Sequence, residues 1–284
     1  MKNITIEKPT NDSLPAQLLS LYNAFKNVKD GEDLEFDLNK LVWVSPLLVL
    51  PISAYISSTN SRCNLDNCSV KDYLNIINFP KGIESVSALE LAIQINKNYI
   101  PVGKLRKDLG IDRQRLESMF SKMIFKVVDT SAEGARSAIY YPIEELVGNI
   151  FEHSKKEEGF IFGQYYPKKE YLDICIVDRG RGLKGSYKEE QKIDLTDEEA
   201  INRVMSGHSV KSDVERGYGV RTSKRVVCEG LGGSFILLSG SMALISSQNK
   251  DKIVELPGFY WQGVIVAYRI PKPIKSIDIS KYVE

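Results

Sequence analysis

The sequence has few of the residues that would build a disulfide scaffold or a zinc site. Its 284 residues include 4 cysteines and 2 histidines. Cys63 and Cys68 form a loose pair with no histidine nearby, because His153 and His208 lie far along the chain. Cysteines at this low density do not indicate a disulfide framework. We therefore expect reduced thiols, no zinc site and a cytoplasmic protein.

Long hydrophobic runs and an excess of one charge are also missing. The most apolar segment, residues 41–56, is interrupted by Pro46 and Pro51 and is shorter than the roughly 20 residues of a membrane span. The first residues lack the apolar core of a signal peptide, so we expect no membrane association. Lys and Arg number 38 and Asp and Glu 37, a net charge of +1. This balance argues against a broad nucleic-acid surface, though not against a local basic patch.

The chain length and the order of its short periodic segments predict an α+β protein of about two domains. In residues 1–100 a strand is expected at 34–38, and helices at 14–25 and 47–56. Leu105 to Val127 has helical spacing, which suggests a helical connector at residues 101–130.

Residues 131–272 have a clearer pattern, and residues 273–284 remain as a tail. A long helix is expected at 132–154, followed by a hairpin of strands at 159–166 and 171–177. A glycine-punctuated loop is expected after Asp178. Helices are then expected at 197–205 and 220–231. Strands are expected at 234–238, 243–246, 253–256 and 264–270. Together they predict a sandwich of helices on a mostly antiparallel sheet.

A first group of polar residues lies on the long helix. Glu145, Asn149 and His153 are spaced four residues apart and therefore form one line on a helix surface. A carboxylate and an amide oxygen one turn apart could hold a water and a hard cation, and Mg²⁺ prefers such oxygen ligands. The alternative is a solvated polar face.

A second group follows the strand that ends the hairpin. The apolar strand leads directly into Asp178-x-Gly180-x-Gly182. A carboxylate at a strand end can accept a hydrogen bond from an exocyclic amine, and the glycines allow a ligand to approach the backbone. The alternative is a tight turn with a capping aspartate.

A third group opens the next helix. Gly217-x-Gly219-Val220 precedes a helical segment, so free backbone N–H groups would point outward there and favour a phosphate. Rossmann spacing and a Walker-type Gly-Lys-Ser/Thr are both absent.

Taken in order, the three groups resemble the Bergerat-type ATP-binding fold of the GHKL superfamily, which includes gyrase, Hsp90, histidine kinases and MutL. The first group resembles the N box of that superfamily, the second its first glycine box and the third its second glycine box. The resemblance covers residues 130–270. It implies ATP and Mg²⁺ as ligands, and a mobile lid at residues 184–216.

The resemblance also implies a role for each candidate residue. Asp178 would accept from the adenine amine, Asn149 would ligate Mg²⁺, and Glu145 would be the catalytic base that orients an attacking water. Histidine kinases keep an acid at that position without hydrolysing ATP alone, so hydrolysis does not follow automatically. The other expected nucleotide contacts are Gly180, Gly182, Gly217, Gly219, Val220, His153, Ser209 and Lys211.

The N-terminal part offers a second resemblance. Residues 1–80 resemble STAS domains of anti-sigma-factor antagonists, through a strand that leads into a buried helix at Val44-Ser45-Pro46-Leu47. An unrelated small α/β cap is the alternative.

Three functions remain open on these grounds. The first is an ATP- and Mg²⁺-binding regulatory protein with a nucleotide-switched lid, a protein partner or self-association, and slow ATP hydrolysis through Glu145. The second is a protein-serine kinase like those that act on anti-sigma-factor antagonists, with Ser45 as a candidate acceptor. The third is a non-catalytic nucleotide-sensing interaction protein. A complete sensor kinase is not expected, because neither histidine lies on a separate dimerising helix.

Overall fold

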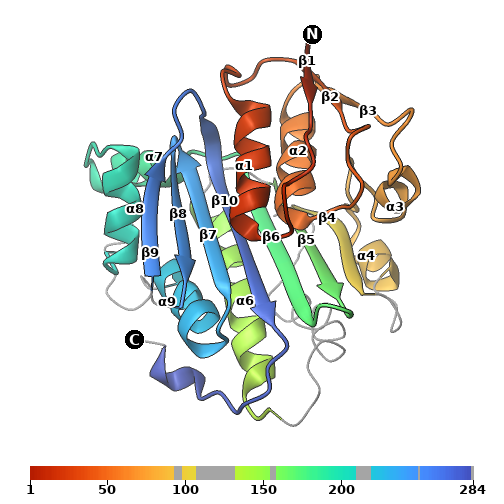
Figure 1. Cartoon of the computed structure of the whole chain (residues 1–284). Coiled ribbons are helices and arrows are strands. Elements are labelled where there is room, and N and C mark those ends of the chain that lie inside the picture. The colour runs from red at the N-terminus through yellow and green to blue at the C-terminus, as the bar shows by residue number, and fades with distance from the viewer. Residues whose placement is uncertain (93–97, 107–131, 154–157, 209–218, 249, 283–284) are drawn as a thin grey trace.

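A seven-stranded antiparallel sheet organises the chain (Figure 1). The computed structural model describes residues 1–92, 98–106, 132–153, 158–208, 219–248 and 250–282, without the side chains of residues 86, 90 and 151–153. The strand order is β4-β5-β6-β10-β7-β8-β9. The strands are β4 (Tyr99–Arg106), β5 (Glu158–Tyr166), β6 (Tyr171–Asp178), β7 (Ser234–Gly240), β8 (Met242–Ser247), β9 (Lys250–Glu255) and β10 (Trp261–Pro271).

The central strands are buried on both faces. Every residue of β6 is buried, and most of its side chains are apolar or β-branched, as is typical of a strand covered on both sides. Asp173 is the charged residue in the interior of the strand, and it forms a bidentate ion pair with Arg269 on β10, at 2.6 and 2.7 Å. The predicted hairpin of β5 and β6 and the other predicted strands of the second half are confirmed.

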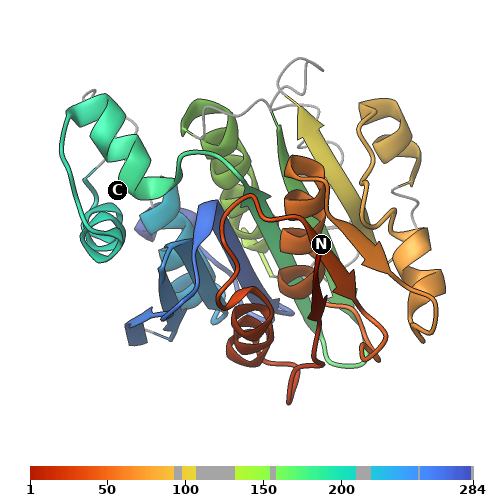
Figure 2. The ribbon, with the colours of Figure 1, turned by 90° about the horizontal axis from the view of Figure 1, so that it is seen from above.

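Helices cover both faces of the sheet, so the protein has three layers (Figure 2). On one face lie α6 (Ala135–His153), α9 (Gly219–Arg225) and the π-helical turn η2 (Val226–Gly230) that continues α9. On the other face lie α1 (Leu14–Phe25) and α2 (Pro46–Ser58). The predicted long helix and the predicted helices of the first half are confirmed within a few residues.

The N-terminal unit, residues 1–79, carries a small parallel sheet of its own. Its strand order is β1-β2-β3, and α3 follows this sheet, while α4 lies beside β4. The N-terminus of α1 is capped by Ser13, whose Oγ accepts from the backbone N–H of Ala16 at 3.3 Å. The bounds are β1 (Lys2–Thr5), β2 (Leu34–Asp37), β3 (Arg62–Asn64), α3 (Lys71–Ile76) and α4 (Val86–Ala92). Together with the large sheet they confirm the α+β class.

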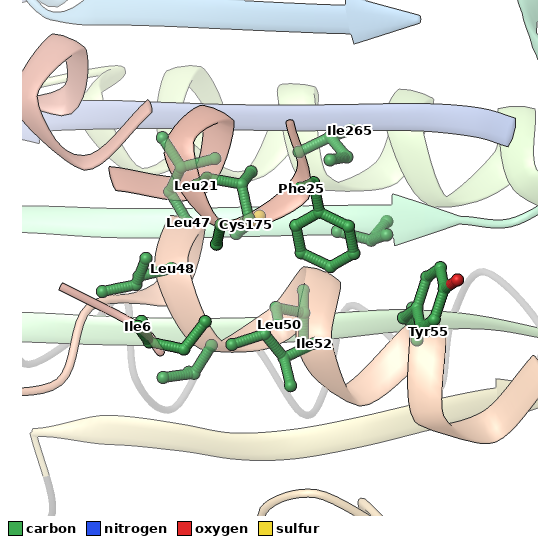
Figure 3. Close-up of a cluster of buried hydrophobic side chains, with 14 of the residues drawn as sticks. Ile6, Leu21, Phe25, Leu47, Leu48, Leu50, Ile52, Tyr55, Cys175 and Ile265 are labelled. Atoms are coloured by element: carbon green, nitrogen blue, oxygen red, sulfur yellow. The ribbon is translucent and has the colours of Figure 1, made fainter. Parts of the chain in front are cut away.

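The largest hydrophobic cluster joins the N-terminal unit to the large sheet. Figure 3 shows Leu21 and Phe25 of α1 beside Cys175 of β6 and Ile265 of β10. Helix α2 is apolar on nearly all sides because it is enclosed by α1 and the sheet, and residues 46–55 are all buried. Each large apolar side chain enclosed here contributes about 1.5–3 kcal/mol to folding. The N-terminal unit and the sheet therefore share one core, and a second cluster fills the α6 face.

Residues 179–181 form the short glycine-containing loop that was expected after Asp178, but a helix that was not expected begins at Gly182. Helix α7 (Gly182–Gln191) and helix α8 (Asp197–Met205) pack on each other through Tyr187 and Ala200. Asp197 of α8 accepts from the backbone N–H and the hydroxyl of Ser241, at 2.9 and 3.2 Å, which fixes α8 to the turn between β7 and β8. Helix α7 was not predicted, because it is stabilised by packing against α8, which no local sequence pattern indicates.

Other expectations are met only in part. The helical connector was predicted wrongly for residues 101–106, which form β4 because they pair with the distant strand β5; the rest of the connector lies outside the described ranges. The short helix η3 (Ile279–Lys281) lies in the expected tail. All four cysteines are free thiols. Within the described residues, no helix has both the length and the apolar character to cross a membrane.

Candidate functional site

Asp178 lies at the end of β6 as a buried carboxylate, with 6% of its surface exposed. Its Oδ1 accepts from the backbone N–H of Gly180 at 2.7 Å. Burial raises the pKa of Asp178 to about 7, and hydrogen bonds from the backbone N–H groups of Gly180 and Val264 oppose part of this rise. A buried carboxyl that titrates near neutral pH is a frequent property of ligand and catalytic sites.

Strand β10 encloses the backbone of Asp178. Gly263 has φ +113°, and a Cβ at this position would lie 2.2 Å from the carbonyl oxygen of Asp178, so only glycine fits. Trp261 Nε1 donates to the same carbonyl oxygen at 3.1 Å. Gln262 Nε2 donates to the carbonyl oxygen of Gly180 at 2.7 Å. The loop that follows Asp178 is therefore held by three consecutive residues of β10.

Gly182 ends this loop and begins α7. It has φ +68°, a conformation that glycine adopts without strain. Ser239 of β7 accepts from the N–H of Leu183 at 3.1 Å and donates to the carbonyl of Gly263 at 2.9 Å. No local sequence pattern indicates Ser239, because only the pairing of β7 with β10 brings it to this loop.

The start of α9 meets the polar line of α6. A Cβ built on Gly219 would lie 2.6 Å from Oε2 of Glu145 and 3.5 Å from Nδ2 of Asn149. The absence of a side chain at Gly219 therefore lets the first turn of α9 approach both polar groups. The structure brings together the first and third predicted motifs, which are separated by about 70 residues of sequence.

The two parts of the candidate site border one hydrophobic cluster. Leu183, next to Gly182, and Val220, next to Gly219, both pack against the cluster under α6. Both parts therefore lie on the α6 face of the sheet, opposite the N-terminal unit.

The residues at the α6–α9 contact fit a magnesium ion that takes most of its ligands from phosphate and water. Glu145 and Asn149 are half-buried and supply oxygen donors beside a helix start. In the part of the chain that the structure describes, no three His, Cys, Asp or Glu side chains gather as a metal site.

Several predicted contacts lie outside the described residues. These are Gly217, Ser209 and Lys211, together with the side chain of His153 at the end of α6. Val220 is half-buried in the first turn of α9.

Comparisons with known proteins add no family to this geometry. No protein-family model matches the chain, and no curated protein matches it either. The fold and the site thus define an α+β protein with a buried carboxylate at a strand end and a polar contact between two helices.

Proposed function

We propose that this protein binds ATP together with Mg²⁺ and acts as a nucleotide-dependent regulatory protein. The observation that carries the proposal is the approach of Gly219 to Glu145 and Asn149. A helix start without a side chain, next to a carboxylate and an amide, suits a phosphate with its magnesium ion. The four free thiols fit the reducing conditions of the cytoplasm.

Asp178 suits the base of the nucleotide. A buried carboxylate at the end of a strand can accept from the exocyclic amine of adenine, and a buried acceptor discriminates strongly against bases that lack a donor there. The backbone of the following loop is held by β7 and β10, so the acceptor is held in place before the ligand arrives.

Glu145 is the candidate base for hydrolysis. Magnesium would supply charge neutralisation on the phosphate oxygens. Glu145 would then orient a water toward the terminal phosphate, with Asn149 one helical turn away. Helices α7 and α8 correspond to the described part of the expected lid, and their contacts with β7 and β8 would change with nucleotide state.

The serine-kinase alternative, with Ser45 as acceptor, receives no support from the geometry. Ser45 is fully buried where α2 begins, and no partner of its hydroxyl is found within the described residues. Phosphate could reach this hydroxyl only if α2 left the sheet. We therefore favour a regulatory role in which the nucleotide itself is the signal.

Isothermal titration with ATP, with and without Mg²⁺, tests the proposal. We expect binding that strengthens with Mg²⁺ and loses this dependence in Asn149→Ala. Asp178→Asn should weaken adenine binding at least tenfold, which is about 1.4 kcal/mol. Asn75→Ala, at an exposed position of α3, serves as the matched control. Absence of binding at millimolar ATP would contradict the proposal, and ATP labelled on the γ-phosphate would separate hydrolysis from transfer to protein.

A further inference from the structure

Arg179 follows Asp178 directly but points toward the N-terminal unit. Only 9% of its side chain is exposed. Its Nη2 donates to Asp30 Oδ1 at 2.8 Å and its Nε to Ser58 Oγ at 3.2 Å. Asp30 lies in the loop after α1, and Ser58 is the last residue of α2. The residue beside the candidate adenine acceptor is therefore bound to two separate elements of the N-terminal unit.

Two aromatic rings complete the surroundings of Arg179. Its guanidinium carbon lies 4.6 Å from the ring centre of Tyr55 and 4.9 Å from that of Trp261. Both distances are within the range of a cation–π contact. Trp261 also donates to the carbonyl of Asp178. The peptide that joins Asp178 to Arg179 is thus held by Trp261 from the sheet and by the Arg179 side chain from the N-terminal unit.

Tyr55 links this contact to the core of the N-terminal unit. Its hydroxyl donates to the carbonyl of Glu32 at 2.8 Å, in the loop that also carries Asp30. Its ring packs edge-on against the rings of Phe25 and Phe36, with 5.3 and 5.9 Å between the ring centres. A shift of α2 relative to the sheet would therefore move the groups that hold Arg179.

Arg181, two residues further on, connects the same loop to α7. It pairs with Glu189 at 2.6 Å and with Glu190 at 2.7 Å. Gly180 lies between the two arginines, and its N–H is the donor to the Asp178 carboxylate. The loop thus bridges the N-terminal unit and the first lid helix.

We propose that Arg179 is a positioning residue through which the N-terminal unit sets the nucleotide affinity of the Asp178 loop. The proposal rests on the proposed function, and it assigns the N-terminal unit as an internal effector. When the unit is seated on the sheet, Arg179 holds Asp178 and Gly180 in the arrangement that receives the base. Linkage requires the reverse effect as well, so bound nucleotide stabilises the seated unit.

Three single variants, the double variant of Asp30→Ala with Arg179→Met, and one control separate positioning from general stability. Asp30→Ala removes the partner in the N-terminal unit without altering the loop. Arg179→Met removes the charge but keeps an unbranched side chain, and Arg179→Lys restores the charge. The control is Lys169→Ala, which breaks the Lys169–Asp12 ion pair. That pair also joins the N-terminal unit to the sheet, but at the turn where β6 begins rather than where it ends.

ATP·Mg²⁺ titration of the full chain gives the first readout, after thermal unfolding has shown that each variant folds. We expect Asp30→Ala and Arg179→Met to weaken binding about tenfold, within the usual range of coupling between sites. The double variant should bind no more weakly than Arg179→Met, because both changes remove one interaction. Arg179→Lys should recover part of the affinity, and Lys169→Ala should stay within about twofold of wild type. The proposal would be overturned if the losses of affinity in Asp30→Ala and Arg179→Met add up in the double variant, or if Lys169→Ala loses as much affinity as they do.

Hydrogen exchange in the nucleotide-free protein gives the second readout. The Gly180 amide should exchange at least tenfold faster in Asp30→Ala than in wild type, and at the wild-type rate in Lys169→Ala. An unchanged Gly180 rate in Asp30→Ala would overturn the positioning role even if affinity fell. If the wild-type protein binds no ATP, the proposed function fails, and this exchange experiment still decides whether Arg179 positions the loop.

Discussion

Replacing Asp178 by asparagine should make the protein more stable at alkaline pH. Asp178 is buried and its pKa is raised to about 7 by that burial. Above this pH the folded protein must keep an ionised carboxylate away from water, whereas the unfolded chain solvates it. Asparagine keeps an oxygen that can accept from Gly180 and carries no charge.

The size and sign of the effect follow from proton linkage. The carboxyl titrates near 4 in the unfolded chain and at about 7 in the folded one. The folded state therefore binds more protons between these values, so stability decreases as pH rises through this window and is level above it. Three pH units at about 1.4 kcal/mol each lower the unfolding free energy of the wild type by about 4 kcal/mol. This loss of stability is complete above pH 7 and absent below pH 4.

Urea unfolding of wild type and Asp178→Asn at pH 4.5, 6, 7 and 8 measures the difference. The gain in unfolding free energy should grow with pH and level off above pH 7. Asp173→Asn on the same strand is the matched control, because Asp173 is paired with Arg269. The Asp173→Asn change leaves the largely buried Arg269 without a charged partner and should lower the unfolding free energy by about 3 kcal/mol. If the unfolding free energy of Asp178→Asn at pH 8 is equal to or lower than that of wild type, the reasoning is refuted.

Three further outcomes are expected. Gly219→Ala should change the unfolding free energy by no more than about 1 kcal/mol, because the new Cβ would displace only the movable carboxylate of Glu145. Titration with and without Mg²⁺ should nevertheless show that ATP binding by this variant depends less on the metal. Gly263→Ala should lower the unfolding free energy by about 3 kcal/mol or more, since its Cβ would overlap the carbonyl of Asp178; an unchanged urea midpoint would contradict this close approach. ATP affinity should fall by up to about tenfold per pH unit below pH 7, as Asp178 takes up a proton and loses the charge that makes it a strong acceptor, and this dependence should be absent in Asp178→Asn.

Elements with local signals could be predicted from the sequence. Helix α1 begins and ends as predicted because Ser13 caps it and its apolar residues repeat at helical spacing. Helix α8 also matches, because Thr196 and Glu199 form a capping box. By contrast, α7 was missed, since it depends on Tyr187 packing against α8 and on ion pairs made by Arg181.

The candidate site divides in the same way. Glu145, Asn149 and Gly219 were singled out from short motifs, and the packing of α6 on α9 places them together. The surroundings of Arg179 could not be predicted, because its hydrogen-bond partners lie 121 and 149 residues away in the chain. No local pattern reports contacts over such separations.

The position of β10 in the sheet has a consequence for how the chain folds. This strand follows the other described strands in sequence, yet it lies in the middle of the sheet and separates β4-β5-β6 from β7-β8-β9. The β5-β6 hairpin and the β7-β8-β9 meander can pair their strands soon after synthesis, because their contacts are local, whereas β4 pairs with β5 over at least 52 residues of sequence. Neither can be joined to the other until β10 has left the ribosome. We therefore expect the newly made chain to expose the unpaired edges of β6 and β7 until β10 is available. In that state chaperone binding or aggregation competes with completion of the fold.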